Sequence, residues 1–172
     1  DNDGWLDLFV TSYFMSVDDT ARTYLGLPHN ATTMKLYRNR HDGSFEDVTA
    51  AVALDKVFMP MGSNFGDIDN DGFLDMYLGM GSPSYASLLP HVLLKNEGGR
   101  TFVYVTASSG TGEIHKGHGI AFADLDADGS PEIVTGRQVL DSNGNLLWTG
   151  VGGAGTIGSG SLSIVCDFDL DG

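Results

Sequence analysis

A short acidic pattern recurs four times along this chain of 172 residues. Aligned on its glycine, it reads DNDGWLD at residues 1–7 (loop 1), DIDNDGFLD at 67–75 (loop 2), DLDADGSPE at 124–132 (loop 3) and DFDLDG at 167–172 (loop 4). Each complete copy has carboxylates at positions one, three, five and nine and glycine at position six. Because the copies share one pattern, they are expected to occupy equivalent places in repeated structural units.

The spacing of the carboxylates suits a calcium ion. Calcium takes six to eight oxygen ligands, and alternate residues of a tight loop can direct their carboxylates to a common centre while glycine permits the sharp turn. Position seven, occupied by Trp5, Phe73 or Ser130, can add a backbone carbonyl oxygen. Magnesium suits such a cage less well, because it demands octahedral geometry and retains its water ligands.

The loops could also be EF-hands or solvated turns without an ion. An EF-hand needs a glutamate at position twelve of the loop and flanking helices. Position twelve is Val10, Leu78 or Thr135, and the flanking segments are rich in the aromatic and branched residues typical of strands. A solvated Asp-Gly turn would explain any single copy, but four copies in register favour a bound cation.

The charge distribution points to the same loops. The chain carries 23 acidic and 9 basic residues, for a net charge of −14, and the loops contain 14 of the acidic residues. The remaining acidic residues equal the basic ones in number, so four calcium ions would reduce the net charge to about −6. Such a balance argues against nucleic acid or an anionic membrane surface as partner. No apolar run reaches 18 residues, so no membrane span is expected.

Between the loops, the sequence predicts short strands joined by turns. Each unit has a strand before its loop, a strand after it and a hairpin, as in RQVLD and NLLWTG, where Asn143 and Gly144 are expected to supply positive φ angles. Four strands per unit predict an all-β fold, a β-propeller of four-stranded blades. The segments 12–33 and 79–90 vary most between units and are expected to form inserted loops on one face.

These residues resemble a known family. The segments NFGDIDNDG (64–72) and LYRNRHDGSFEDVTAAVAL (36–54) are similar to the FG-GAP repeats of integrin α-subunit propellers, and to the related VCBS-type repeats of bacterial adhesion and cartilage-acidic-protein-like chains. The resemblance implies calcium ligands in every loop. They are Asp1, Asp3, Trp5 and Asp7; Asp67, Asp69, Asp71, Phe73 and Asp75; Asp124, Asp126, Asp128, Ser130 and Glu132; and Asp167, Asp169 and Asp171.

The chain departs from the family pattern in loop 3 and in its repeat count. Glu132 replaces the usual aspartate and follows Pro131, so this site is expected to differ in shape or strength. A propeller closes a ring of four to eight blades, whereas residues 1–172 hold about three repeats and begin and end within loops. The chain is therefore expected to be one partial propeller domain that joins further blades of a longer protein.

The expected function is recognition rather than catalysis. The single cysteine, Cys166, is expected to pack in the core, and calcium sites of this type fill where the ion is abundant, which favours an extracellular location. His115 and His118 have metal-ligand spacing but align with an ordinary blade strand, so no catalytic residue is predicted. The sequence favours a calcium-stabilised adhesion or recognition scaffold for protein or glycan. The alternative is the propeller portion of a secreted polysaccharide-degrading enzyme.

Overall fold

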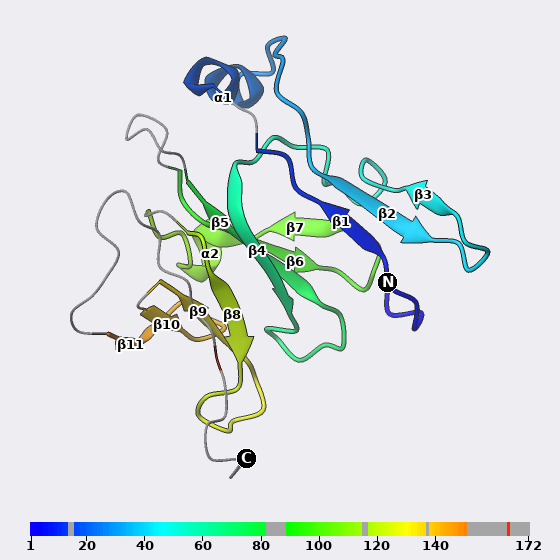
Figure 1. The fold of residues 1–172 in the computed structure, drawn as a ribbon. Coiled ribbons are helices and arrows are strands. Elements are labelled where there is room, and N and C mark those ends of the chain that lie inside the picture. The colour runs from blue at the N-terminus through cyan, green and yellow to red at the C-terminus, as the bar shows by residue number, and fades with distance from the viewer. Residues whose placement is uncertain (14–15, 82–88, 115–116, 137, 151–164, 166–172) are drawn as a thin grey trace.

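The computed structural model describes residues 1–13, 16–81, 89–114, 117–136, 138–150 and 165. In this part of the chain the strands form three antiparallel sheets that follow one another across the molecule (Figure 1). The strands are β1 (Leu8–Val10), β2 (Lys35–Asn39), β3 (Phe45–Asp47), β4 (Pro60–Gly66), β5 (Asp75–Met80), β6 (Val92–Asn96), β7 (Phe102–Tyr104), β8 (Ile120–Ala123), β9 (Glu132–Thr135), β10 (Gln138–Leu140) and β11 (Leu146–Thr149).

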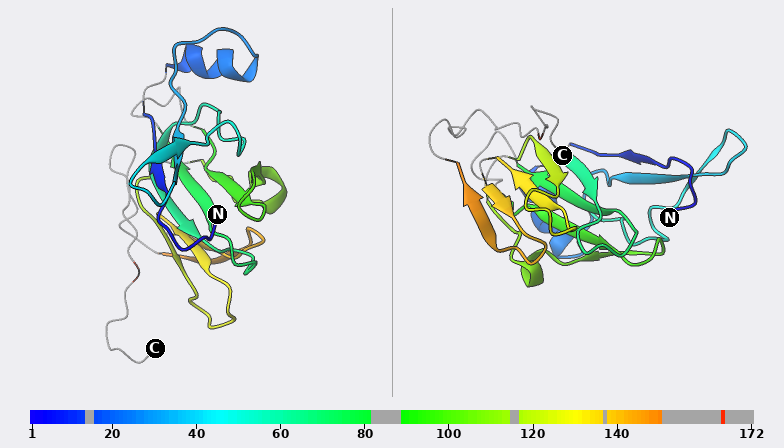
Figure 2. Two further views of the ribbon diagram at one scale, coloured as in Figure 1. Left: turned by 90° about the vertical axis from the view of Figure 1, so that its right-hand side faces the viewer. Right: turned by 90° about the horizontal axis from the view of Figure 1, so that it is seen from below.

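The order of strands confirms the prediction of an all-β chain built from loop-and-hairpin units. One sheet has the order β4-β5-β6-β7, another β8-β9-β10-β11, and the first described sheet has the order β1-β2-β3. Figure 2 shows from two further directions that the β4–β7 sheet lies between the other two. The sheets do not close into a ring within the described residues, so the closed propeller stays a prediction.

Loops 2 and 3 are held at the same register of their hairpins. Gly66 pairs with Asp75 across the β4–β5 ladder, and Ala123 pairs with Glu132 across the β8–β9 ladder. In both sheets the last residue before the loop therefore faces position nine of the loop. This register fixes where each acidic loop leaves its sheet.

Two local predictions were wrong. The inserted segment 12–33, expected as a loop, contains helix α1 (Val17–Tyr24), because Ser16 caps it by accepting a hydrogen bond from the N–H of Asp19 at 3.0 Å. Asp18 also pairs with Arg22 one turn later. The Ser-x-x-Asp spacing is a capping signal that the sequence contained. A second short helix, α2, spans Thr106–Ser109.

The turn between β10 and β11 also differs from expectation. Gly144 has a φ of 78°, but Asn143 is not in the left-handed region. The Asp141 carboxylate holds the turn instead, since its Oδ1 accepts from the N–H groups of Asn143 at 2.9 Å and Asn145 at 2.7 Å. A two-residue turn would need positive φ angles at both Asn143 and Gly144. Here only Gly144 has one, and the hydrogen bonds to the Asp141 side chain stabilise the turn.

The central strand β5 is buried on both faces. All of its residues are buried, and Met76, Leu78 and Met80 contribute to the core beneath the β1-β2-β3 sheet, whereas Tyr77 contributes to the core shared with the β8–β11 sheet. Tyr77 also donates from its hydroxyl to the carbonyl oxygen of Thr111 at 2.7 Å. Burial on two faces explains why this segment shows no alternation of apolar and polar residues.

Several residues singled out from the sequence lie outside the described part of the chain. These are Asp167, Asp169 and Asp171 of loop 4, Cys166, His115 and most of the inserted segment 79–90. In the described residues no helix is long and apolar enough to cross a membrane.

Glycine allows the β4–β7 and β8–β11 sheets to approach closely. A Cβ atom added at Gly62 would lie 2.4 Å from the carbonyl oxygen of His118, and one added at Gly66 would lie 2.4 Å from the ring of Phe122. The contact at Gly62 involves backbone atoms, which cannot rotate away. The spacing between these two sheets therefore depends on the absence of a side chain at this position.

We expect Gly62→Ala to lower the free energy of unfolding by about 1 to 3 kcal/mol, because the added methyl group must push the sheets apart. Chemical denaturation followed by intrinsic fluorescence would measure the change. Ser63→Ala is the matched control, since Ser63 is the exposed neighbour on the same strand. Equal stabilities of the two variants would contradict the close approach described here.

Candidate metal centre

Loops 1, 2 and 3 share one backbone conformation. In each of them, positions four and six have positive φ angles. The angles are 62°, 60° and 61° at position four (Asn2, Asn70 and Ala127) and 87°, 90° and 91° at position six (Gly4, Gly72 and Gly129). The glycine was anticipated from the sequence, whereas the left-handed position four was missed. Asparagine at two of these positions was the available signal, because it tolerates this conformation better than most residues.

Loops 2 and 3 each gather three carboxylates around a small space. One oxygen from each of Asp67, Asp69 and Asp71 lies within 4.8 Å of the other two, and the same holds for Asp124, Asp126 and Glu132. Both loops lie at the opposite end of their sheets from α1 (Figure 1). The structure thus brings together six of the residues that the sequence predicted as metal ligands.

The carboxylate at position one closes the loop on itself. Asp67 accepts from the N–H of Asp71 at 3.0 Å with Oδ1 and from the N–H of Gly72 at 2.8 Å with Oδ2. In loop 3, Asp124 accepts from the N–H groups at the corresponding positions five and six, at 3.2 and 3.0 Å. These bonds set the turn that brings positions three and five toward position one.

The carboxylate at position nine fastens loop 2 to its sheet. Asp75 is fully buried, and it accepts from the N–H of Ile68 at 3.0 Å and from the N–H of Asn96 in β6 at 2.8 Å. Burial raises the pKa of Asp75 to about 6, and the charges of Asp69 and Asp71 act in the same direction, while the two N–H bonds oppose the rise. Both oxygens thus have protein partners, and a ligand role for Asp75 stays a prediction.

Position nine behaves differently in loop 3. Glu132 accepts from the N–H of Leu125 at 2.7 Å with Oε2, and its carboxylate also joins the metal-sized group with Asp124 and Asp126. Burial raises the pKa of Glu132, as do the neighbouring carboxylates. The longer side chain therefore gives loop 3 a group of carboxylates from positions one, three and nine, in place of one, three and five. The grouping of carboxylates thus differs between loops 2 and 3, and the altered ion site expected from Glu132 stays a prediction.

Asp128, at position five of loop 3, lies outside that group. Its Oδ1 accepts from the N–H of Ser130 at 2.8 Å. Asp71 makes the equivalent bond to the N–H of Phe73 at 2.9 Å while remaining within its own group. The carbonyl oxygens predicted as ligands at Phe73 and Ser130 follow directly in the chain, and their role stays a prediction.

Basic side chains contact the carboxylates of loop 1. Arg38 contacts Asp1 at 2.9 Å, and the ring of His41 contacts Asp3 at 2.7 Å and stacks on Trp5 with 4.7 Å between ring centroids. The N–H of Trp5 and the bond to His41 hold the pKa of Asp3 below its usual value. In the described residues Asp1, Asp3 and Asp7 do not form a metal-sized group. The predicted ligands of loop 1, the Trp5 carbonyl included, therefore stay a prediction.

A basic residue followed by asparagine supports the loops from the neighbouring strand. Lys95 in β6 forms an ion pair with Asp69, as Arg38 in β2 does with Asp1, so each cation meets position three of its loop. The next residues, Asn39 and Asn96, each donate from their side-chain amide to the carbonyl oxygen at position eight, at 3.1 Å. This pair of residues was not predicted, although LYRN and LLKN end the two strands in the same way.

The donor set fits a hard cation. Carboxylate oxygens are the ligands that calcium and magnesium prefer, and the Lys95 ammonium beside Asp69 shows that a positive group is accommodated at this position. Loops 2 and 3 could therefore hold a metal ion, bound by Asp67, Asp69 and Asp71 or by Asp124, Asp126 and Glu132.

We expect Ala127→Asn to raise the free energy of unfolding by up to about 1 kcal/mol, because alanine in the left-handed conformation carries strain that asparagine largely avoids. Ala127→Val is the contrasting variant, and its branched side chain should lower stability. Thermal melting in the presence of a chelator would compare both with the parent. A less stable Ala127→Asn protein would contradict the strain at this position.

The first part of the chain matches a known protein family. Residues 1–78 match the family described as FG-GAP-like repeat. The matched range contains loops 1 and 2, the β1-β2-β3 sheet and β4. A search of the curated proteins gave no match. The match confirms, over residues 1–78, the resemblance to FG-GAP repeats drawn from the acidic loops and their strands.

Proposed function

We propose that the chain is a calcium-binding β-propeller segment that acts outside the cell as a recognition or adhesion scaffold for protein or glycan. The observation that carries the proposal is the pair of metal-sized carboxylate groups in loops 2 and 3, held by the same backbone turn. The FG-GAP-like family match and the stacking of similar sheets support a propeller.

Calcium is favoured over other cations by the number and kind of ligands. The loops offer carboxylates and backbone carbonyls, which are hard oxygen donors, and leave room for water, since Asp69 and Asp71 are exposed. Sites of modest affinity are filled where calcium is abundant, which supports an extracellular location. The acidic excess around the loops also disfavours nucleic acid as partner.

The ion would act as a structural fastener. When bound, it would neutralise carboxylates that otherwise repel one another. The chain itself supplies the rest of the site: Asp67 closes the turn, and Asp75 ties the loop to β6 through Asn96. Because the folded loop binds the ion and the unfolded chain does not, binding would add directly to the stability of the fold.

We expect calcium to raise the melting temperature of protein first treated with a chelator. Each site filled at 100 times its Kd adds about 2.7 kcal/mol to the free energy of unfolding. Asp69→Asn should remove the part of this shift that comes from loop 2, because in the described residues the Asp69 carboxylate accepts no backbone hydrogen bond and pairs with Lys95. Differential scanning calorimetry at several calcium concentrations would measure both effects.

Glu46→Gln is the matched control for this experiment, since it makes the same change of charge at an exposed position in β3. Its calcium-dependent shift should equal that of the parent. The proposal is wrong if calcium gives no shift in the parent, or if Asp69→Asn and Glu46→Gln respond alike.

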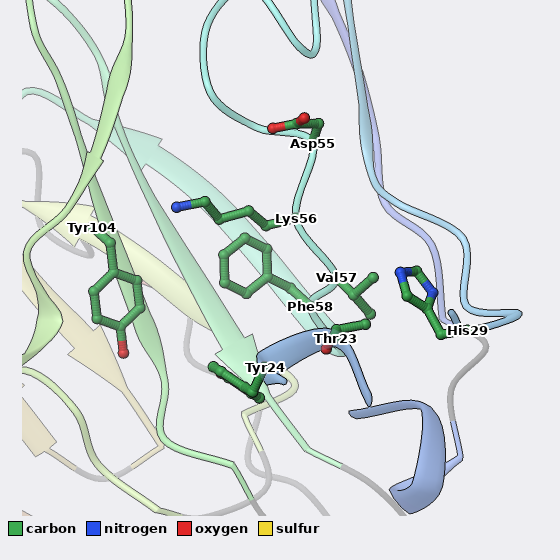
Figure 3. Close-up of a pocket in the computed structure, with 8 residues that line it drawn as sticks. All are labelled: Thr23, Tyr24, His29, Asp55, Lys56, Val57, Phe58 and Tyr104. Atoms are coloured by element: carbon green, nitrogen blue, oxygen red, sulfur yellow. The ribbon is translucent and has the colours of Figure 1, made fainter. Parts of the chain in front are cut away.

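A pocket at the other end of the sheets is suited to recognition. It has a volume of about 490 Å³ and lies between α1, the segment that leads into β4 and the end of β7 (Figure 3). Its lining residues are Thr23, Tyr24, His29, Asp55, Lys56, Val57, Phe58 and Tyr104. The helix that the sequence did not predict therefore supplies one wall of this pocket.

The lining of the pocket favours a glycan. The rings of Tyr24 and Tyr104, drawn in Figure 3, are exposed and offer flat apolar surfaces on which the face of a sugar ring can pack, while the buried Phe58 lies behind them. Asp55 and Lys56 add one acceptor group and one donor group for hydroxyls, with opposite charges. A concave apolar site with a few polar groups is typical of small-molecule recognition.

The alternative of a polysaccharide-degrading enzyme receives less support from this pocket. Glycoside hydrolysis generally needs two carboxyl groups on opposite sides of the scissile bond. The described lining contains the single carboxylate of Asp55. We therefore favour binding over hydrolysis as the role of this surface.

We expect Tyr104→Ala to weaken binding to a glycan by about tenfold, because removing one stacking surface costs on the order of 1.4 kcal/mol. A glycan array would first identify the binding oligosaccharide, and isothermal titration calorimetry would then compare the variants. Tyr13→Ala is the matched control, since Tyr13 is similarly exposed but lies outside the pocket. An array without binding, or equal losses in both variants, would contradict glycan recognition here.

A further inference from the structure

Loops 1, 2 and 3 are linked by a hydrogen bond that occurs at both junctions. Asn2 of loop 1 donates from Nδ2 to the carbonyl oxygen of Gly72 in loop 2, at 2.9 Å. Asn70 of loop 2 donates in the same way to the carbonyl oxygen of Gly129 in loop 3, at 2.7 Å. Each bond joins position four of one loop to position six of the loop in the next sheet.

In loop 3, the peptide group whose carbonyl oxygen accepts this bond also donates its N–H to a carboxylate. The carbonyl oxygen of Gly129 accepts from Asn70, and the N–H of the same peptide group, which belongs to Ser130, donates to Oδ1 of Asp128 at 2.8 Å. Two hydrogen bonds on opposite sides of one peptide group fix its plane and strengthen each other. The Asn70 amide therefore influences Asp128, a predicted ligand next to the group of Asp124, Asp126 and Glu132, although it does not touch it.

The same arrangement occurs in loop 2. The carbonyl oxygen of Gly72 accepts from Asn2, and the adjoining N–H of Phe73 donates to Oδ1 of Asp71 at 2.9 Å. Asp71 belongs to the metal-sized carboxylate group of loop 2. The repetition at two junctions indicates that the contact belongs to the repeat itself.

The donor of each bond lies between two predicted ligands of its own loop. Asn70 is preceded by Asp69 and followed by Asp71, so an ion held by both carboxylates would fix the backbone on either side of Asn70. A fixed Asn70 would present its amide to Gly129 without further loss of conformational freedom. Filling loop 2 would thereby prepare loop 3.

We propose that Asn70 is a positioning residue that couples the metal loops 2 and 3, so that an ion bound in one of them strengthens binding in the other. The inference rests on the proposed calcium binding. Coupling between two binding sites is reciprocal, so filling loop 3 strengthens binding in loop 2 by the same factor. Ala127, at position four of loop 3, has no amide and cannot pass the coupling further.

The test measures whether loop 2 responds to the loss of the site in loop 3. Terbium replaces calcium as the probe, and a tryptophan at position seven of loop 2 sensitises its luminescence. The reporter protein carries Phe73→Trp together with Trp5→Phe, which exchanges two residues that already occupy position seven. Asp126→Asn then weakens the site in loop 3.

We expect Asp126→Asn to reduce the terbium affinity of loop 2 about fivefold in the reporter protein. In a reporter that also carries Asn70→Gly, the same substitution should reduce the affinity less than about twofold. Glycine adopts the positive φ of this position freely, so Asn70→Gly removes the amide without straining the loop. Asn2→Gly is the matched control, and it should leave the response of loop 2 to Asp126→Asn unchanged.

The outcomes separate the inference from the function on which it rests. Sensitised emission with the same affinity loss in the presence and absence of Asn70→Gly would overturn the coupling through Asn70 and leave metal binding intact. Emission without any effect of Asp126→Asn would overturn coupling altogether. No sensitised emission from the reporter, with no calcium-dependent rise in its melting temperature, would overturn the proposed calcium binding itself.

Discussion

Repulsion among the carboxylates of each acidic loop is the constraint around which the rest of the structure is arranged. The chain meets it with backbone N–H groups at positions two, five, six and seven, and with a cation on the neighbouring strand. Lys95 beside Asp69 and Arg38 beside Asp1 show the same solution in two sheets. A turn held so firmly leaves its remaining carboxylate oxygens directed to one small space.

The acidic loops and the pocket lie at two ends of the molecule that differ in chemistry. At one end, the loops stand close enough for Asn70 to reach Gly129 in the next sheet. At the other end, α1 and the approach to β4 form a pocket with aromatic and charged lining. The sheets between them are packed closely enough that Gly62 has no room for a side chain. Close packing of the sheets can therefore hold the pocket at a fixed place relative to the loops.

Much of the fold and of the candidate site could be predicted, because the decisive signals are local. Asp-x-Asp-x-Asp-Gly fixes a turn through bonds between near neighbours, and strands such as that of Leu93 are marked by their branched and apolar residues. The helix at Val17–Tyr24 was missed although Ser16 and Asp19 formed a capping signal. Polar residues elsewhere in the segment 12–33 favoured a loop, and the helix has only eight residues.

The sequence alone determined the acidic loops, the all-β class and the four-stranded unit, since each depends on the spacing of residues within one segment. Only the tertiary structure decided that Arg38 in β2 and Lys95 in β6 pair with the carboxylate at position three of their loops. It also decided that the asparagines at position four donate a hydrogen bond to the next loop. It also brought Tyr24 and Tyr104 to one pocket. These contacts join residues far apart in the chain, and their distances are set by the packing of whole sheets, which no local pattern encodes.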